Sequence, residues 1–213
     1  MQHAPDQGMR IIWFRCFRAV AETPSGRNGL KQFLSGSTEV PGVQLRALDR
    51  WNLVTALIAH DDSEADAIFA AEKQRDATGD GQKYAYVAEA ARPDAAIKRR
   101  YFKDFLENAS RPEDWVEQSL YAFNYWNESA LTAPYLKVAL EAIPEIKRER
   151  KIFFLEDWLN AFIDGQQSPA AQAEVYAYLK SAEIDPDLRL KILQAVDELD
   201  RTVAIRRKFR DQR

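Results

Sequence analysis

Prolines placed at the start of apolar, periodic segments constrain this chain more than any other feature of its sequence. Thr23-Pro24, Ser168-Pro169 and Asp185-Pro186 each put a cap-forming side chain directly before a proline. Arg92-Pro93-Asp94 and Arg111-Pro112 also place a proline where a first helical position is expected. Proline suits the first position of an α-helix because its missing N–H has no intrahelical partner there and its φ angle is already helical. The chain is therefore expected to begin a new helix at short intervals.

The residues between these starts follow helical spacing. In the last segment the apolar positions recur every three or four residues, at Leu188, Ile192, Val196, Leu199 and Val203. The nearest candidate for a strand, Val40–Leu45, is interrupted by Pro41-Gly42. With only 8 glycines and 9 prolines in 213 residues, the chain is also poor in the turns that β-sandwiches and barrels require.

These patterns predict an all-α fold with about ten or eleven helices. The expected segments are residues 9–22, 24–35, 43–59, 62–74, 77–91, 93–108, 112–122, 127–142, 144–163, 169–181 and 186–209. Helices of this length joined by short turns pack as antiparallel neighbours, which favours an α-α superhelix of the HEAT or armadillo type. We expect residues 1–213 to form a single helical solenoid domain.

Composition excludes several classes of function. A net charge of −3 gives no general electrostatic case for a nucleic-acid partner. The longest uncharged runs, Trp51–His60 and Gln118–Asn127, are shorter than the ~18 residues of a membrane span, so no membrane partner is expected and a cytoplasmic location is slightly favoured. Two distant histidines, His3 and His60, do not form a zinc-binding motif, and Cys16 in its apolar run is expected to be a core residue.

One acidic stretch is loosely similar to a calcium-binding loop. Asp76, Thr78 and Asp80 alternate as oxygen ligands would, but Val87 occupies the position where such a loop needs a bidentate glutamate. We therefore interpret this stretch as a cap and turn between two helices. The basic clusters at residues 147–151 and 201–213 are interpreted as charged helix surface.

Aromatic residues are concentrated between positions 121 and 126, in the sequence Tyr-Ala-Phe-Asn-Tyr-Trp. Four aromatics in six residues cannot share one helical stripe, so we expect some of them at the surface. With one further tyrosine they form a candidate domain-contact surface of Tyr121, Tyr125, Trp126 and Tyr135. The alternative, that these side chains fill the core between neighbouring helices, stays open.

The order and spacing of several segments resemble the C-terminal region of aminopeptidase N-type zinc metallopeptidases, the membrane alanyl aminopeptidase-like family. The matching segments are Arg50–Val54, Glu72–Gly81, Ala88–Pro93 followed by Lys98, Trp115, Phe123-Asn124, Leu131–Leu136 and Ile146–Phe154. The similarity extends over roughly residues 10 to 209. In that family this region is a helical superhelix that packs over the catalytic domain and walls off the substrate chamber.

The resemblance implies a parent enzyme that removes N-terminal residues from peptides with zinc as its cofactor, and a catalytic domain of the same polypeptide as the partner. This chain has no His-Glu-x-x-His motif, so the family's zinc ligands and general base correspond to no residue here. We expect neither catalytic nor metal-binding residues in this C-terminal fragment and predict that it is inactive alone. The alternative is a stand-alone α-solenoid that binds a protein or peptide.

Overall fold

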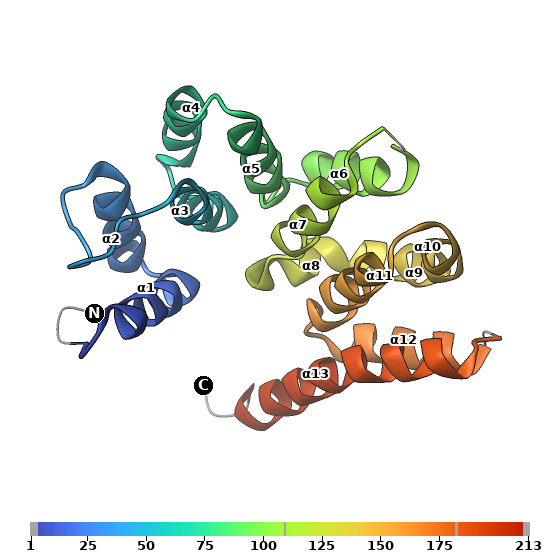
Figure 1. Ribbon diagram of the computed structural model, residues 1–213. Helices are drawn as coiled ribbons and strands as arrows, with labels where there is room; N and C mark the ends of the chain where they lie inside the picture. The colour runs from blue at the N-terminus through green and yellow to red at the C-terminus, as the bar shows by residue number, and fades with distance from the viewer. Residues whose placement is uncertain (1–3, 109, 182, 211–213) are drawn as a thin grey trace. The chain divides into compact units, whose positions relative to one another are not determined.

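The computed structural model describes residues 4–108, 110–181 and 183–210, and most of these residues are helical (Figure 1). Among them the only β-type pairing is an isolated antiparallel bridge between Val40 and Val43. The all-α prediction is confirmed. None of the described helices is long and apolar enough to cross a lipid bilayer.

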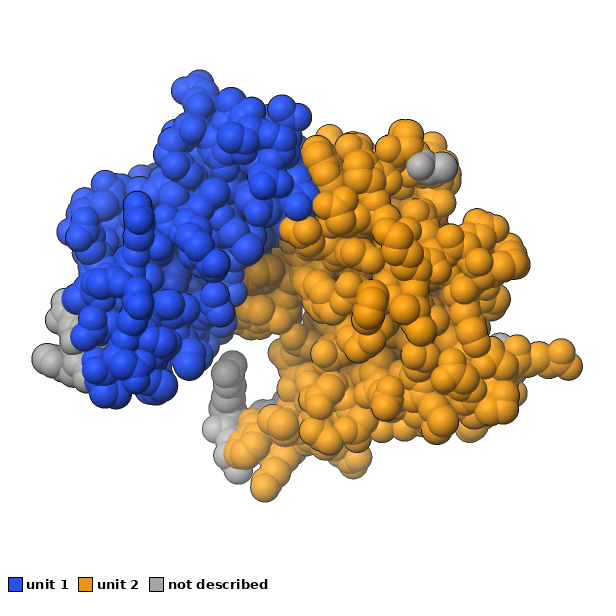
Figure 2. Space-filling model, viewed as in Figure 1, with its two compact units in different colours: residues 1–93 blue, residues 94–213 orange. Residues whose placement is uncertain are grey.

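The chain divides into two compact units, residues 1–93 and 94–213 (Figure 2). The first unit contains α1 (Gln7–Val20), α2 (Pro24–Ser35), α3 (Ala47–Ala59), α4 (Ala65–Arg75) and α5 (Gly79–Ala90). Helix α3 packs against each of the other four, which makes it the centre of this unit. Its side chains from Leu53 to Ala59 are buried with the exception of Thr55, as a helix surrounded by others requires.

Local capping explains where the helices of the first unit begin. The Thr23 hydroxyl accepts a hydrogen bond from the Gly26 N–H at 3.1 Å, directly before Pro24, and starts α2. Thr78 caps α5 in the same way through the Gly81 N–H at 3.0 Å. These side chains satisfy N–H groups that have no partner within the helix.

Among the described residues, the second unit contains ten α-helical and short 3-10 or π segments after its first helix. In chain order it runs α6 (Ala95–Glu107), α7 (Glu113–Phe123), η1 (Trp126–Glu128), α8 (Ser129–Thr132), η2 (Ala133–Tyr135), α9 (Leu136–Glu141), α10 (Ile143–Glu149), α11 (Ile152–Leu159), η3 (Asn160–Asp164), α12 (Pro169–Ser181) and α13 (Pro186–Arg210). Within it α6 packs on α7 and α8, α7 on α11, and α12 on α13. This stacking of neighbouring helices is that of an α-α superhelix.

Aromatic rings fill the core of the second unit. The ring centroids of Trp158 and Phe162 lie 4.4 Å apart, and Phe102 lies 5.6 Å from Phe162. Phe123 from α7 joins the same cluster at 5.8 Å from Phe162. Rings from α6, α7, α11 and η3 thus meet in one place, and pairs of this geometry stabilise a core beyond their buried area.

Two of the expected helices are interrupted. The segment expected at 127–142 is divided into η1, α8, η2 and α9, with Pro134 in the 3-10 turn η2, because a proline removes a backbone donor from the helix interior. The segment expected at 144–163 is broken at Arg150, whose backbone is extended with φ −106° and ψ 163°. The expectation that Cys16 is a core residue is wrong, because its side chain is exposed. A single domain over 1–213 stays a prediction.

Candidate functional site

The end of helix α7 decides how the aromatic segment 121–126 is distributed. Helix α7 ends at Phe123, and the Asn124 N–H closes it with a hydrogen bond to the Leu120 carbonyl oxygen at 3.1 Å. Tyr125 and Trp126 lie beyond the end of the helix. Their side chains therefore need not point in the direction that the helical spacing gives to Phe123, which is in the core.

Two of the four predicted contact residues are exposed. Tyr121 has 48% and Trp126 has 40% of its surface accessible to solvent. Tyr125 is half-buried, with its ring centroid 6.4 Å from that of Trp126. An exposed tryptophan beside tyrosines is typical of protein-contact surfaces, since each ring offers a large apolar area at a low entropic cost.

The hydroxyl of Tyr121 is tied to a neighbouring helix. Its Oη atom donates a hydrogen bond to Asp157 Oδ1 of α11 at 2.8 Å. Burial of the hydroxyl, together with this hydrogen bond, raises the pKa of Tyr121 to about 12. Tyrosine is protonated at neutral pH in any case, so the shift keeps the phenol as a hydrogen-bond donor to Asp157.

Tyr135 lies elsewhere in the second unit. It is half-buried, and its ring centroid is 4.7 Å from that of Phe102 and 5.5 Å from that of Phe123. The structure thus brings Tyr125 and Trp126 together and packs Tyr135 on the aromatic core. The contact surface of Tyr121, Tyr125, Trp126 and Tyr135 stays a prediction.

A buried ion pair, which was not predicted from the sequence, fixes the backbone on both sides of Tyr125 and Trp126. The ammonium of Lys98 is completely buried and lies 2.5 Å from Glu128 Oε2. It also donates a hydrogen bond to the Phe123 carbonyl oxygen at 2.7 Å. Because Phe123 precedes Tyr125-Trp126 and Glu128 follows them, one lysine of α6 fixes both ends of this segment.

The sequence did contain a signal for this lysine. Lys98 shares one face of α6 with Tyr101, Phe102 and Phe105, all of which are buried. Burial lowers the pKa of Lys98 against the opposing effect of Glu128. Burial likewise raises the pKa of Glu128 to about 7, although Lys98 acts to lower it.

The acidic stretch in the first unit forms a turn, as predicted. Asp76 Oδ2 accepts a hydrogen bond from the Trp51 indole N–H at 3.0 Å, and Asp76 Oδ1 accepts one from the Thr78 hydroxyl at 2.6 Å. Asp80 is exposed. Among the described residues no three His, Cys, Asp or Glu side chains are grouped to hold a metal ion. These residues therefore do not fit the zinc of the aminopeptidase family.

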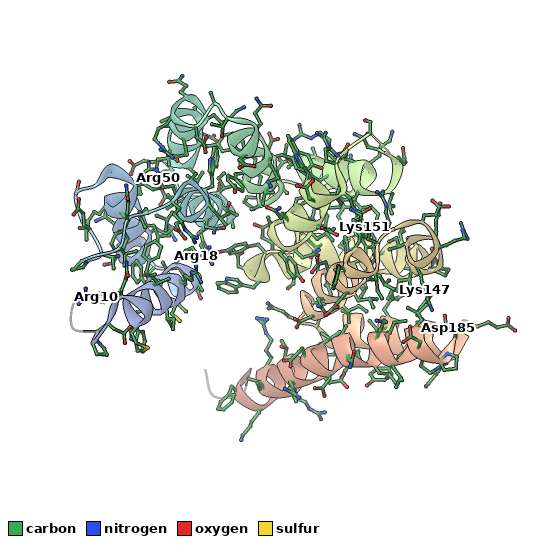
Figure 3. All side chains as sticks on the ribbon, viewed as in Figure 1. Arg10, Arg18, Arg50, Lys147, Lys151 and Asp185 are labelled. Atoms are coloured by element: carbon green, nitrogen blue, oxygen red, sulfur yellow. The ribbon has the colours of Figure 1, made fainter. Side chains whose placement is uncertain are left out.

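The basic cluster at 147–151 is paired with surface carboxylates. Lys147 Nζ lies 2.7 Å from Asp185 Oδ2, and the two side chains point toward one another in Figure 3. Lys151 Nζ lies 3.9 Å from Glu113 Oε1. In the second basic cluster Arg201 pairs with Asp197 and Glu198, while residues 211–213 lie outside the described part of the chain. These contacts agree with charged helix surface.

Comparison with known proteins assigns the family. Residues 3–201 match the ERAP1-like C-terminal domain, and the chain belongs to that family. The aminopeptidase N of Streptomyces lividans is 27% identical over 195 residues, which are 91% of this chain and 23% of that enzyme. The chain thus spans about a quarter of the length of this curated relative. The resemblance to the C-terminal region of aminopeptidase N-type enzymes is confirmed.

Proposed function

We propose that this chain is the non-catalytic C-terminal domain of a zinc aminopeptidase, where it caps the substrate chamber and restricts access to peptides. The observation that carries the proposal is the family match over residues 3–201, together with a relative that is an aminopeptidase of which this chain covers 23%. In this proposal, N-terminal residues are removed by a catalytic domain of the same polypeptide.

In this proposal the helical fold forms one wall of the substrate chamber. Stacked helices form extended surfaces, and closing a chamber around the reacting groups excludes water and large substrates. The described residues group no metal ligands, so in this proposal any zinc belongs to the catalytic domain.

We propose that one contact with the catalytic domain is made by Tyr121, Tyr125 and Trp126, while Tyr135 packs on the aromatic core beside Phe123. The Tyr121–Asp157 hydrogen bond and the Lys98–Glu128 pair hold this segment in one conformation. A surface held in place before docking loses less conformational entropy when it binds.

The test begins with the reading frame that encodes this chain. We expect it to continue upstream into a segment with a His-Glu-x-x-His motif. In that enzyme, removal of residues 94–213 should increase the cleavage of long or folded substrates relative to an aminoacyl anilide, since the anilide is small enough to enter with or without the cap.

Two results would contradict the proposal. The first is one zinc per molecule in the purified chain, measured by elemental analysis. The second is aminopeptidase turnover that survives repeated purification of the chain alone.

A further inference from the structure

Helix α1 presents an apolar face to solvent within the first unit. Ile12 and Trp13 are each 52% exposed and Val20 is 70% exposed. Cys16 is exposed between them. Positions 13, 16 and 20 are three and four residues apart, the spacing along which one helix packs on another, and Ile12 lies one turn before Cys16. We call Ile12, Trp13, Cys16 and Val20 the α1 stripe.

The other face of α1 is already packed. Phe14 is buried, with its ring centroid 5.3 Å from that of Phe33, and Phe17 contacts the same ring at 6.0 Å. Arg10 donates from Nη1 to the Pro41 carbonyl oxygen at 2.9 Å. The helix is therefore packed along one face, while the described residues of the first unit leave the α1 stripe exposed. A helix with apolar residues around most of its surface is typically buried by neighbours on more than one side.

Charge indicates what kind of surface would cover the stripe. Between Gln7 and Val20 there are three arginines and no carboxylate. Arg15 and Arg18 line a cleft of about 280 Å³ with Phe14, Leu48 and the start of α3. Among the described residues neither arginine has a carboxylate within ion-pair distance, whereas Arg46 at the same cleft is paired with Asp49 at 3.0 Å. Figure 3 labels Arg10 and Arg18 on α1.

We propose that the α1 stripe docks on a helix of the catalytic part of the parent aminopeptidase, and that carboxylates beside that helix pair with Arg15 and Arg18. The inference rests on the proposed function. It is supported by the relative, most of whose length lies outside the matched 23%. A second copy of the chain fits less well, because facing α1 helices would bring arginines together without carboxylates between them.

The thiol of Cys16 is a built-in reporter, since it lies in the middle of the stripe. In the chain alone it should react with a maleimide at the rate of an exposed thiol. In the full aminopeptidase polypeptide the docked stripe should slow this reaction at least about tenfold, because labelling then requires a local opening. Cleavage after glutamate and mass spectrometry identify the Cys16 peptide among others.

Two matched variants separate docking from a general change in surface hydrophobicity. Trp13→Ser in the full polypeptide should return Cys16 labelling to the rate seen in the chain alone. Phe153→Ser removes an aromatic ring that is 72% exposed but lies on α11, outside the stripe, and should leave Cys16 protected.

Equal labelling of Cys16 in the chain and in a full polypeptide that carries the His-Glu-x-x-His motif would overturn this inference and leave the proposed function intact. Slow labelling of the chain alone would also overturn it, and a dimeric mass by light scattering would then assign the stripe to a second copy. If the reading frame encodes no catalytic part, both the proposed function and this inference are wrong.

Discussion

The two units each bury a glutamate, and the pKa values of the two carboxyls move in opposite directions. Glu72 in the first unit and Glu128 in the second are both 3% exposed. For both, burial is the largest influence and raises the pKa. Hydrogen bonds from Arg75 and Arg50 nevertheless bring the pKa of Glu72 below its ordinary value, whereas Lys98 leaves that of Glu128 at about 7.

The difference lies in the partners. Arg50 donates to Glu72 from Nε at 3.0 Å and from Nη2 at 2.8 Å, and Arg75 adds a donor from Nε at 2.9 Å. The guanidinium groups of Arg50 and Arg75 both keep some contact with water. The ammonium of Lys98, in contrast, is completely buried together with the carboxylate of Glu128. Several charged donors thus outweigh the cost of burying an anion, and a single buried ammonium does not.

Among the buried charged groups, the largest effect on stability is expected from Glu72→Leu. This change leaves Arg50 largely buried without its carboxylate and should lower the free energy of unfolding by about 3–5 kcal/mol. Urea denaturation measures it. Glu107→Leu is the control, because Glu107 forms an exposed pair with Lys103 and should have little influence. A cost of Glu72→Leu no greater than that of the control would show that the Arg50–Glu72–Arg75 cluster is not needed.

The pH dependence of stability should reveal the raised pKa of Glu128. The carboxyl of Glu128 keeps its proton up to about pH 7 in the native state but only up to about pH 4.5 in the unfolded state. Its contribution to stability is therefore complete below pH 4.5 and is lost as the pH rises through 7. The stability of the native protein relative to Glu128→Gln should therefore fall by up to about 3 kcal/mol between pH 4.5 and 7.5. A constant difference across this range would contradict the raised pKa.

Replacing the lysine of this pair should cost less than replacing Glu72. In Lys98→Met the carboxyl of Glu128 can remain protonated, because its pKa is already about 7. The main loss is the hydrogen bond to the Phe123 carbonyl oxygen, for which we expect about 2 kcal/mol at pH 7 by urea denaturation. The double variant Lys98→Met/Glu128→Leu should be more stable than Lys98→Met alone. A cost equal to that of Glu72→Leu would mean that Glu128 remains ionised.

Local signals explain which elements could be predicted from the sequence. The segments 24–35 and 169–181 coincide with α2 and α12, because proline and capping side chains define their starts without help from distant residues. The expected helix 127–142 failed for a tertiary reason as well as for Pro134. Its first turn, η1, carries Glu128 inward to a lysine thirty positions earlier. Spacing places Lys98 on the apolar face of α6, but it does not identify Glu128 as its partner.

The candidate surfaces show the same limit. The crowding of aromatics indicated that some would be exposed, but the end of α7 at Phe123 decides which. On α1 the apolar residues surround the helix, so the sequence alone placed Cys16 in the core. Which of two apolar faces is covered depends on the contact with Phe33, which is distant in the sequence.

The smallest effect is expected at the surface of the second unit, where two tryptophans provide a matched pair. Trp158 is 1% exposed within the aromatic core, and Trp158→Ala should cost about 3–5 kcal/mol in the chain. Trp126 is 40% exposed, and Trp126→Ala should change the melting temperature of the chain only slightly, as should Tyr125→Ala. In the parent enzyme Trp126→Ala should weaken the docking of the domain and lower activity. If Trp126→Ala destabilises the chain as strongly as Trp158→Ala, then Trp126 is a core residue and the contact surface proposed around it does not exist.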